Sequence, residues 1–330
     1  MTQVDKPRRE QRPSLLTTGA EPTATSLFVN GHAPNRRWLV ILLASLGGFL
    51  LTVIWSAEFV DRTIGDSVAN TALGHDAKAT PIAGILAGVA FAFVSGIAGT
   101  FTACNIAAFS AVAPLVGKTQ SRLARLGQTL KPLGWLSVGI IAVSATYGVI
   151  VALVGTNMPQ FDETMNRSGF SPRLIQAMVL FGVVGVIMIY LGLAALRLAP
   201  DPMAGIAKRF PNAPLVFLGG LIGGFLIGRP FELFRIMFRD AAESGNVLYG
   251  AGAFALQSLG NIVILAVLFL ILAYTAGARL GSWLTEKPSR FSVMVASGFL
   301  VAGVFTVLYW DVRILARREL IWYPIAPWIE

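Results

Sequence analysis

Seven long stretches of the chain contain no Asp, Glu, Lys or Arg, and they set the strongest limit on the fold. They are 38–57, 79–117, 132–161, 174–196, 210–228, 244–278 and 291–310. A helix needs about 20 predominantly apolar residues to cross the ~30 Å hydrocarbon core of a membrane, and it pairs its backbone N–H and C=O groups within itself. The stretches lack the alternation of membrane β-strands. The sequence therefore predicts an all-α integral membrane protein with about seven transmembrane helices.

The first 37 residues differ from the rest because they are basic and poor in apolar side chains. Their basic residues are Lys6, Arg8, Arg9, Arg12, Arg36 and Arg37. No apolar core follows before Trp38, so a secretory signal is not indicated. The segment cannot bury enough apolar surface to offset the cost of ordering. We expect 1–37 to be a disordered cytoplasmic tail and 38–57 to be an extra transmembrane helix.

Basic residues are distributed unequally between the segments that join the stretches. With seven crossings and the N-terminus inside, 16 Lys and Arg lie on the inner side and 10 on the outer side. Basic residues near the spans favour the cytoplasm. We therefore expect the N-terminus in the cytoplasm and the C-terminus outside, in the inner membrane of a bacterium. The net charge of +9 reflects this asymmetry, and the partners expected are the lipid bilayer and other membrane proteins, not nucleic acid.

The stretch 79–117 is too long for one simple crossing. As a helix its 39 residues would extend roughly 58 Å at 1.5 Å per residue. It is either a tight hairpin of two crossings or one crossing with a break around Gly96–Cys104. A hairpin lowers the inside-to-outside count of basic residues from 16:10 to 14:12, so the count favours one interrupted crossing. Interrupted helices in transporters mark binding sites.

After the first crossing, the chain divides into two halves, 82–196 and 213–310, each with three predicted helices. Three is odd, so the halves would insert with opposite topology, as two inverted three-helix repeats. Each begins with an interrupted, glycine-rich segment, and Pro230 would break the second one. The glycines expected to let helices approach closely are Gly84, Gly88, Gly219, Gly220, Gly223, Gly224 and Gly228. The alternative is that no repeat exists, because any protein with six helices can be divided into two groups of three.

Phe101-Thr102-Ala103-Cys104 and the stretch GGFLIGRPF at 223–231 stand at the two expected breaks. In this order of features the chain resembles the CcdA/DsbD-like family of membrane thiol–disulfide electron carriers over roughly residues 82–310. The resemblance implies two inverted three-helix repeats and a role in thiol redox handling or maturation of a partner, as in cytochrome c biogenesis.

The chain departs from the family pattern at the cysteines. Ala103 and Ala107 replace the prolines that flank the first cysteine, and Phe231 stands after Pro230, where the second cysteine would be. A dithiol relay needs two sulfurs that exchange through a mixed disulfide. The single cysteine of this chain therefore implies that the full relay is lost.

Cys104 is the candidate catalytic thiol, and the alternative is a buried cysteine that packs as a small apolar residue. The only two histidines, His32 and His75, lie in the tail and in a loop. We therefore expect no metal site and no cofactor.

Buried amides are the second group of candidates. Gln257 and Asn261 are four residues apart, so they share a helix face, with Ser258 beside them. They are expected either to form hydrogen bonds between helices or to line a polar cavity. Asn105 is expected to cap the helix that follows the break or to line the same cavity.

A charged group follows the fifth span. Glu232 is three residues from both Arg229 and Arg235, so ion pairs on one helix face are expected. Arg229 would be a functional candidate if it lay within the membrane. If the helix ends at Gly228, the group is an outer loop, and this second interpretation is favoured.

The last segment, 311–330, contains Trp322, Tyr323 and Trp328 and is expected to anchor at the headgroup level or to dock a partner subunit. No nucleotide-binding loop, zinc motif, nucleophile elbow or pair of catalytic carboxylates is recognisable, so an enzyme is not favoured. Three functions remain: a thiol-redox protein without the full relay, an accessory subunit of a larger membrane complex, and a small-solute transporter.

Overall fold

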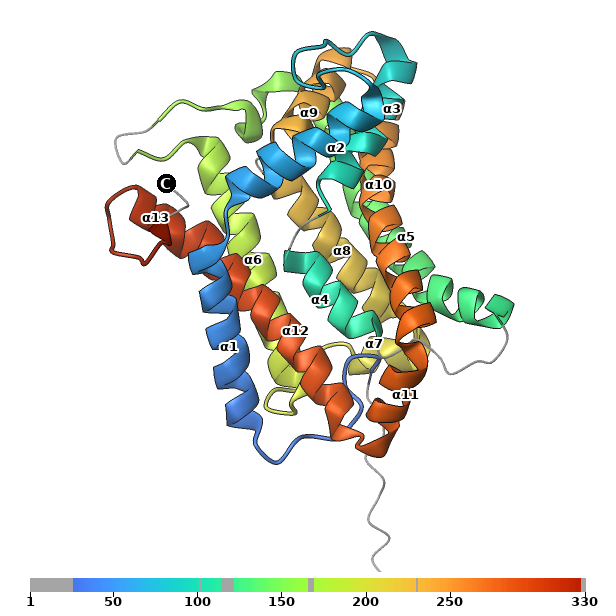
Figure 1. The fold of residues 1–330 in the computed structure, drawn as a ribbon. Helices are drawn as coiled ribbons and strands as arrows, with labels where there is room; N and C mark the ends of the chain where they lie inside the picture. Colours follow the sequence, from blue (N-terminus) through green and yellow to red (C-terminus); the bar gives the residue numbers. More distant parts are fainter. Residues whose placement is uncertain (1–25, 101–102, 114–121, 166–168, 230, 328–330) are drawn as a thin grey trace, which may run out of the picture.

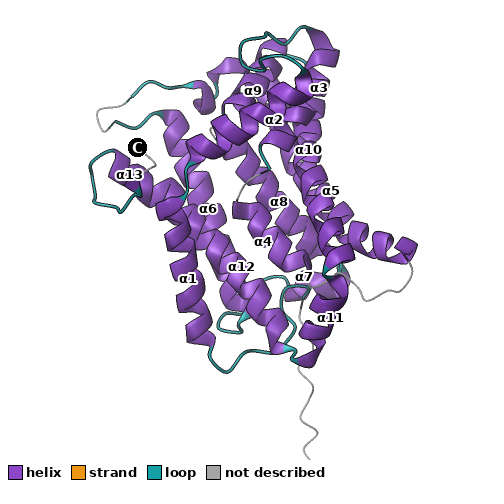
Figure 2. Ribbon diagram, viewed as in Figure 1, coloured by secondary structure: helices purple, strands orange, loops and turns teal. Residues whose placement is uncertain are grey.

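The computed structural model describes residues 26–100, 103–113, 122–165, 169–229 and 231–327. Across these ranges the regular elements are all helices, which confirms the predicted all-α architecture (Figure 2). Most of the helices run side by side in one bundle (Figure 1).

Five helices are long and apolar enough to cross a membrane, which indicates a membrane protein. They are α1 (Arg37–Ile54), α5 (Arg122–Val154), α6 (Pro172–Ala195), α10 (Val247–Thr275) and α12 (Ser289–Val307), the last continuing through η5 (Leu308–Val312) and α13 (Arg313–Arg317). A sixth crossing results if α8 (Ala213–Gly228) and α9 (Glu232–Ser244) count as one bent span. The apolar helix α3 (Gly84–Ala98) is shorter. A total of seven stays a prediction.

Shorter elements join these helices. They are η1 (Phe59–Gly65), α2 (Asp66–Leu73), α4 (Ala103–Val112), η3 (Gly155–Asn157), η4 (Pro159–Phe161), α7 (Ala204–Arg209) and α11 (Gly277–Glu286). The π-helical η1 continues into α2, which packs on α3. Figure 1 shows α2, α9 and the start of α3 together at one end of the bundle.

Four helix pairs make the main contacts of the bundle: α3 with α10, α5 with α8, α5 with α10, and α6 with α12. Each pair crosses at two glycines, one from each helix. These glycine pairs are Gly96 with Gly260, Gly139 with Gly219, Gly148 with Gly250 and Gly185 with Gly303. A Cβ added to any of them would lie 3.0 Å or less from a backbone oxygen of the partner helix. Because lipid gives apolar helices little reason to associate, such close packing is what holds the bundle together.

The glycines singled out from the sequence fall into three groups. A Cβ would collide with a neighbour at Gly88, Gly219 and Gly228 and would be tight at Gly223. At Gly220 and Gly224 the nearest atoms of other helices are 3.6 and 4.0 Å away, which is ordinary contact. Gly84 has no neighbour within 4 Å of a Cβ, so the expected packing role is wrong for it. Its φ of +85° shows that the backbone conformation at the start of α3 is what favours glycine there.

The end of the predicted disordered tail is ordered, which corrects the prediction for residues 26–36. Phe28 is buried and its ring meets that of Phe299 edge-on, with centroids 5.3 Å apart. The Ser292 hydroxyl donates to Asn30 Oδ1 at 2.6 Å, and Arg197 donates to the carbonyl of Gly31 at 2.7 Å. One aromatic side chain and a few polar contacts fix this segment against α12. Residues 1–25 lie outside the described ranges.

The C-terminal segment begins as a continuation of the last long helix, and its role as an interfacial anchor stays a prediction. The last helix continues to Arg317, and the buried Arg313 donates to the carbonyls of Thr52 and Trp55 at 2.8 and 2.9 Å. Arg313 thereby satisfies the final carbonyls of α1, as a C-terminal cap does. Trp322 is 86% exposed, as an anchor would be, and Trp328 lies outside the described ranges.

Candidate functional site

The first interrupted helix breaks inside the predicted segment Gly96–Cys104. Helix α3 ends at Ala98 and α4 begins at Ala103. Helix α3 packs on α10, whereas α4 packs on α12. Two helices of a tight hairpin would instead pack on each other, so the contacts fit the interrupted crossing.

Hydrogen bonds satisfy the backbone at this break. The Thr100 hydroxyl donates to the carbonyl of Ile97 at 2.8 Å, and the N–H of Gly99 donates to the carbonyl of Ser95 at 2.9 Å. The side-chain amide of Asn105 donates to the carbonyl of Thr100. Unpaired carbonyls at a helix end are costly when they are buried. The break is therefore a specifically stabilised structure.

The second interrupted helix turns sharply. Helix α8 ends at Gly228, α9 begins at Glu232, and their axes differ by 88°. The predicted breaker, Pro230, lies outside the described residues. The helix ends where the outer-loop interpretation requires, yet Arg229 is only 6% exposed. The loop interpretation is therefore wrong for Arg229, because the chain turns inward against α3 after Gly228.

Arg229 joins the two breaks. Its Nη1 donates to the carbonyl of Gly99 at 2.6 Å, and its Nη2 forms an ion pair with Asp61 of η1. Its guanidinium also lies 5.1 Å from the ring centroid of Phe231. A Cβ on Gly99 would lie 2.2 Å from the Phe234 ring. The first break thus has room only for glycine at the position that Arg229 binds.

Burial raises the pKa of the Asp61 carboxyl, and the charge of Arg229 opposes this rise. The direction means that desolvation of Asp61 outweighs its attraction to the arginine. The Asp61–Arg229 pair is therefore sensitive to acid.

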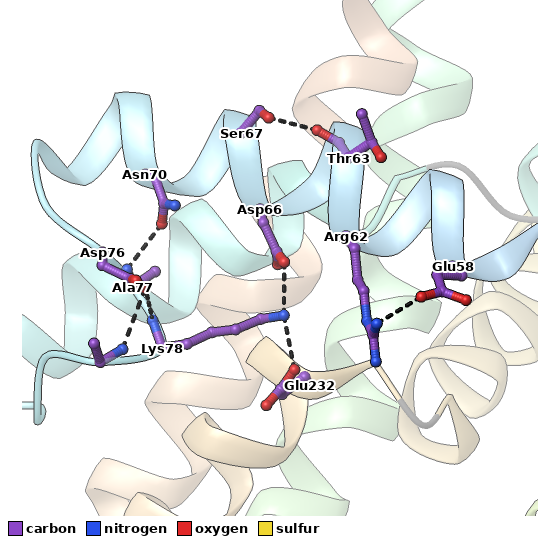
Figure 3. A network of polar contacts seen from close by, with 11 residues as sticks. Glu58, Arg62, Thr63, Asp66, Ser67, Asn70, Asp76, Ala77, Lys78 and Glu232 are labelled. Carbon is purple, nitrogen blue, oxygen red and sulfur yellow. Dashed lines mark hydrogen bonds and ion pairs between the residues drawn. The ribbon is translucent and has the colours of Figure 1, made fainter.

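The other charged residues pair differently from the prediction. Glu232 pairs with Lys78 at 2.7 Å, and Lys78 also pairs with Asp66 of α2 at 2.6 Å. Figure 3 shows Lys78 between the two carboxylates. Burial lowers the pKa of Lys78, but its hydrogen bonds with the two carboxylates outweigh that effect and raise it. The expected pairs of Glu232 with Arg229 and Arg235 are not formed, because these arginines pair with Asp61 and Glu163 instead.

A buried group of three amides, Asn105, Gln257 and Asn261, lies beside the first break, and we call it the amide cluster. The amide of Asn105 donates to Asn261 Oδ1 at 3.1 Å, linking α4 to α10. Asn261 Nδ2 and Gln257 Nε2 are buried without a hydrogen-bond partner among the described residues. One turn away, the Ser258 hydroxyl donates to Ser144 of α5 at 2.6 Å. Asn261 and Ser258 thus form the expected bonds between helices, with two amide donors left over.

A cavity of about 780 Å³ lies at the end of the bundle where α1 ends and α6 begins. Arg229 and Glu232 line it, as expected, whereas Asn105, Gln257, Ser258 and Asn261 are buried apart from it. The basic residues in its wall are Arg62, Lys78, Arg173, Arg229, Arg235, Arg317 and Arg318. The acidic ones are Glu58, Asp61, Glu163 and Glu232. The described wall therefore has an excess of positive charge.

Sequence reasoning missed Asp61, Lys78, Glu163 and Arg173. They lie in the charged segments 58–78 and 162–173, which were used only to count basic residues. Asp61, Lys78 and Glu163 each pair with a residue far away in the chain, so no local spacing indicates those contacts. Arg173 pairs with Glu163 of its own segment. Charged residues clustered in those two segments were the only available signal.

Cys104 is the second residue of α4, one position before Asn105. Its side chain lies outside the described part of the structure, so its redox role stays a prediction. Within the described ranges, His, Cys, Asp and Glu form no group of three or more that could hold a metal ion.

Comparisons with known proteins give no further guide to this site. No protein-family model, curated protein or solved structure matches the chain. The resemblance to CcdA/DsbD-like carriers therefore rests on the sequence features described above.

Proposed function

We propose that the protein is a transporter of a small polar solute, built from two inverted three-helix repeats, with its binding site where the two interrupted helices meet. The observation that carries this proposal is the hydrogen bond from Arg229, in the second break, to the carbonyl of Gly99, in the first. In many secondary transporters, interrupted helices of inverted repeats meet at the substrate site.

The helix contacts support the repeat. The first helix of each half packs on the second helix of the other half: α3 on α10 and α8 on α5. Each of these crossings uses one glycine pair, Gly96 with Gly260 and Gly219 with Gly139. The second helices pack on each other, and so do the third helices. This is the pattern that a two-fold axis between the halves would produce.

A chain of contacts leads from the cavity to the amide cluster. Arg229 lines the cavity and binds Gly99. The next carbonyl, that of Thr100, accepts a hydrogen bond from Asn105, which in turn binds Asn261. The unpartnered nitrogens of Gln257 and Asn261 are suited to hold a solute oxygen, because a buried donor without a partner costs free energy. With the N-terminus in the cytoplasm of a bacterial inner membrane, the cavity would lie at the outer end of the bundle, with the Asp61–Arg229 pair in its wall.

Transport can be tested with purified protein in liposomes and a panel of radiolabelled amino acids and small organic acids. We expect accumulation of at least one solute, and Asn261→Leu should abolish it because the solute loses its amide partner. Thr146→Val is the matched control, since Thr146 is exposed and bonds only the carbonyl of Ala142 one turn earlier. Transport is excluded for this panel if no solute exceeds the level in protein-free liposomes. Unchanged uptake in Asn261→Leu would place the site elsewhere.

Thiol redox handling is the second candidate, because Cys104 lies in the first turn of the helix after the break and is adjacent in the chain to Asn105 of the amide cluster. Helix N-termini lower thiol pKa values and raise reactivity. If this function holds, Cys104 should form a mixed disulfide with a partner protein, and Cys104→Ser should lose it. If a stoichiometric partner co-purifies equally well with Cys104→Ser, the accessory-subunit function is favoured instead.

A further inference from the structure

The cavity wall carries three more basic than acidic side chains among the described residues. The basic side chains of the wall come from several parts of the chain, including η1, α6, α9 and α13. Clefts lined by one sign of charge raise the local concentration of ions of the opposite sign. The wall of this cavity carries both signs, and its excess of basic side chains favours anions over cations.

One carboxylate is shared by two arginines inside this cavity. Glu163 Oε1 accepts from Nη1 of Arg173 and from Nη2 of Arg235. Arg173 lies in the first turn of α6 and Arg235 in α9, so two helices hold the guanidinium groups. Glu163 lies between η4 and α6, and its side chain is 54% exposed. Glu163 thus forms ion pairs with two arginines, and its accessible side chain lies outside any helix.

We propose that the cavity binds a small anion with a phosphate or sulfate group, held by Arg173 and Arg235 in the place that Glu163 occupies. Guanidinium groups match the oxygens of such anions and form strong charge-assisted hydrogen bonds with them. Glu163 then acts as an internal competitor that an incoming anion displaces. The inference goes beyond the proposed transport and does not depend on it, since the site binds its anion whether or not anything crosses the membrane.

The test is the binding of inorganic sulfate and phosphate to the full-length protein in uncharged detergent, at ionic strength held constant with chloride. Arg235→Gln should weaken binding about tenfold or more, since it removes a charge-assisted hydrogen bond. Glu163→Gln should tighten binding about threefold or more, because it removes the competing charge. Arg239→Gln is the matched control, as Arg239 is exposed on the same helix but outside the cavity wall. Arg235→Lys keeps the positive charge but loses the paired N–H donors of the guanidinium group. This variant should therefore fold normally and bind the anion weakly.

The anion can come from solution or from a lipid headgroup, and nanodiscs distinguish the two sources. Stabilisation by phosphatidylglycerol over phosphatidylcholine, lost in Arg235→Gln, identifies a headgroup phosphate. Binding of free sulfate or phosphate with the same dependence on Arg235 identifies a soluble anion. The proposal is overturned if neither binds, if Arg239→Gln weakens binding as much as Arg235→Gln, or if Glu163→Gln fails to tighten it.

Discussion

The two interrupted helices solve the same problem with different residues. At the first break, the uncharged Thr100 donates to the carbonyl of Ile97 at the end of α3, and the uncharged Asn105 donates to the carbonyl of Thr100. At the second, the chain turns by 88° into an amphipathic helix, and the residue at the turn is a buried arginine. That arginine binds the carbonyl of Gly99. The difference shows that a residue of the second break supplies a hydrogen-bond donor to the first, so the two halves of the molecule are not independent.

The two breaks also differ in the free energy needed to bury their polar side chains. The amides at the first break are neutral, so burying them requires only hydrogen bonds. Burying Arg229 requires a counter-charge, and Asp61 supplies it from η1, outside both halves. The segment between α1 and α3 is therefore part of the site, and Lys78, which follows α2, ties it further to α9.

Loss of the arginine should produce the largest effect. Arg229→Gln leaves Asp61 partly buried without its partner and removes a donor to Gly99. Breaking a buried ion pair on one side costs about 3–5 kcal/mol, and we expect a loss of stability of this size in thermal unfolding in detergent. The double variant Asp61→Asn with Arg229→Gln should cost less than the sum of the two single variants. Arg239→Gln should be close to neutral, and an equal loss in that variant would remove the special role of Arg229.

Glycine substitutions test whether the two halves cross alike. Gly96→Ala and Gly219→Ala each place a Cβ within 2.0 Å of a backbone oxygen, so each should cost about 1–3 kcal/mol. Gly220→Ala and Gly252→Ala are the controls, because a Cβ meets ordinary contact at the first and open space at the second. Alanine also favours a helix over glycine, so the controls should be neutral or slightly stabilising. Unequal costs for Gly96 and Gly219 would argue against equivalent crossings.

The amide pair should have a smaller effect. A double-mutant cycle of Asn105→Leu and Asn261→Leu isolates their mutual hydrogen bond from the other contacts of each residue. Hydrogen bonds between membrane helices are worth about 0.6–2 kcal/mol, and the coupling energy from thermal unfolding should fall in that range. The Ser144 and Ser258 pair, which joins α5 to α10, gives a second cycle for comparison. A coupling energy of zero between Asn105 and Asn261 would show that their hydrogen bond does not stabilise the contact between the first break and α10.

The sequence allowed the helices and the position of the first break to be predicted, because both depend on local composition. Runs without charge mark the membrane helices, and residues 79–117 are too many for one straight crossing. The contacts at the site could not be predicted in this way. The end of the helix at Gly228 predicts an outer loop for Arg229, whereas the bend that follows brings the arginine to Asp61 and Gly99.

The glycine pairs show the same limit. Spacing within one helix indicated Gly219 and Gly223 but also Gly84, which packs on nothing. Gly139, Gly260 and Gly303 have their roles only because a backbone from another helix approaches them. Phe28 likewise looked like part of a disordered tail, because its partner Phe299 is far away in the chain. Pairings across long sequence separations carry no local signal.

Acid should affect two carboxylates of the 58–78 segment in opposite directions. Burial raises the pKa of Asp61 above 3.8, so the folded chain takes up a proton there first, and the stability that this group contributes falls as pH rises through the window above 3.8. Hydrogen bonds from the N–H groups of Lys78 (Figure 3) and Ala79 lower the pKa of Asp76 below 3.8, so the stability that this group contributes is lost as pH falls through the lowered pKa. The Tm of each variant between pH 3 and 7 measures both effects.

The slopes decide this last comparison. Relative to the natural chain, Asp61→Asn should gain stability as pH rises above about 4, on top of a constant loss from the missing ion pair. Asp76→Asn should lose stability relative to the natural chain as pH rises towards the ordinary carboxyl pKa, because its amide carries no negative charge to strengthen the two hydrogen bonds from backbone N–H groups. Slopes of the same sign would mean that Arg229 outweighs burial at Asp61. The second break would then be stabilised mainly by attraction between Asp61 and Arg229, as at an exposed ion pair. Its contrast with the first break, which uses uncharged side chains, would be smaller than the burial of Arg229 indicates.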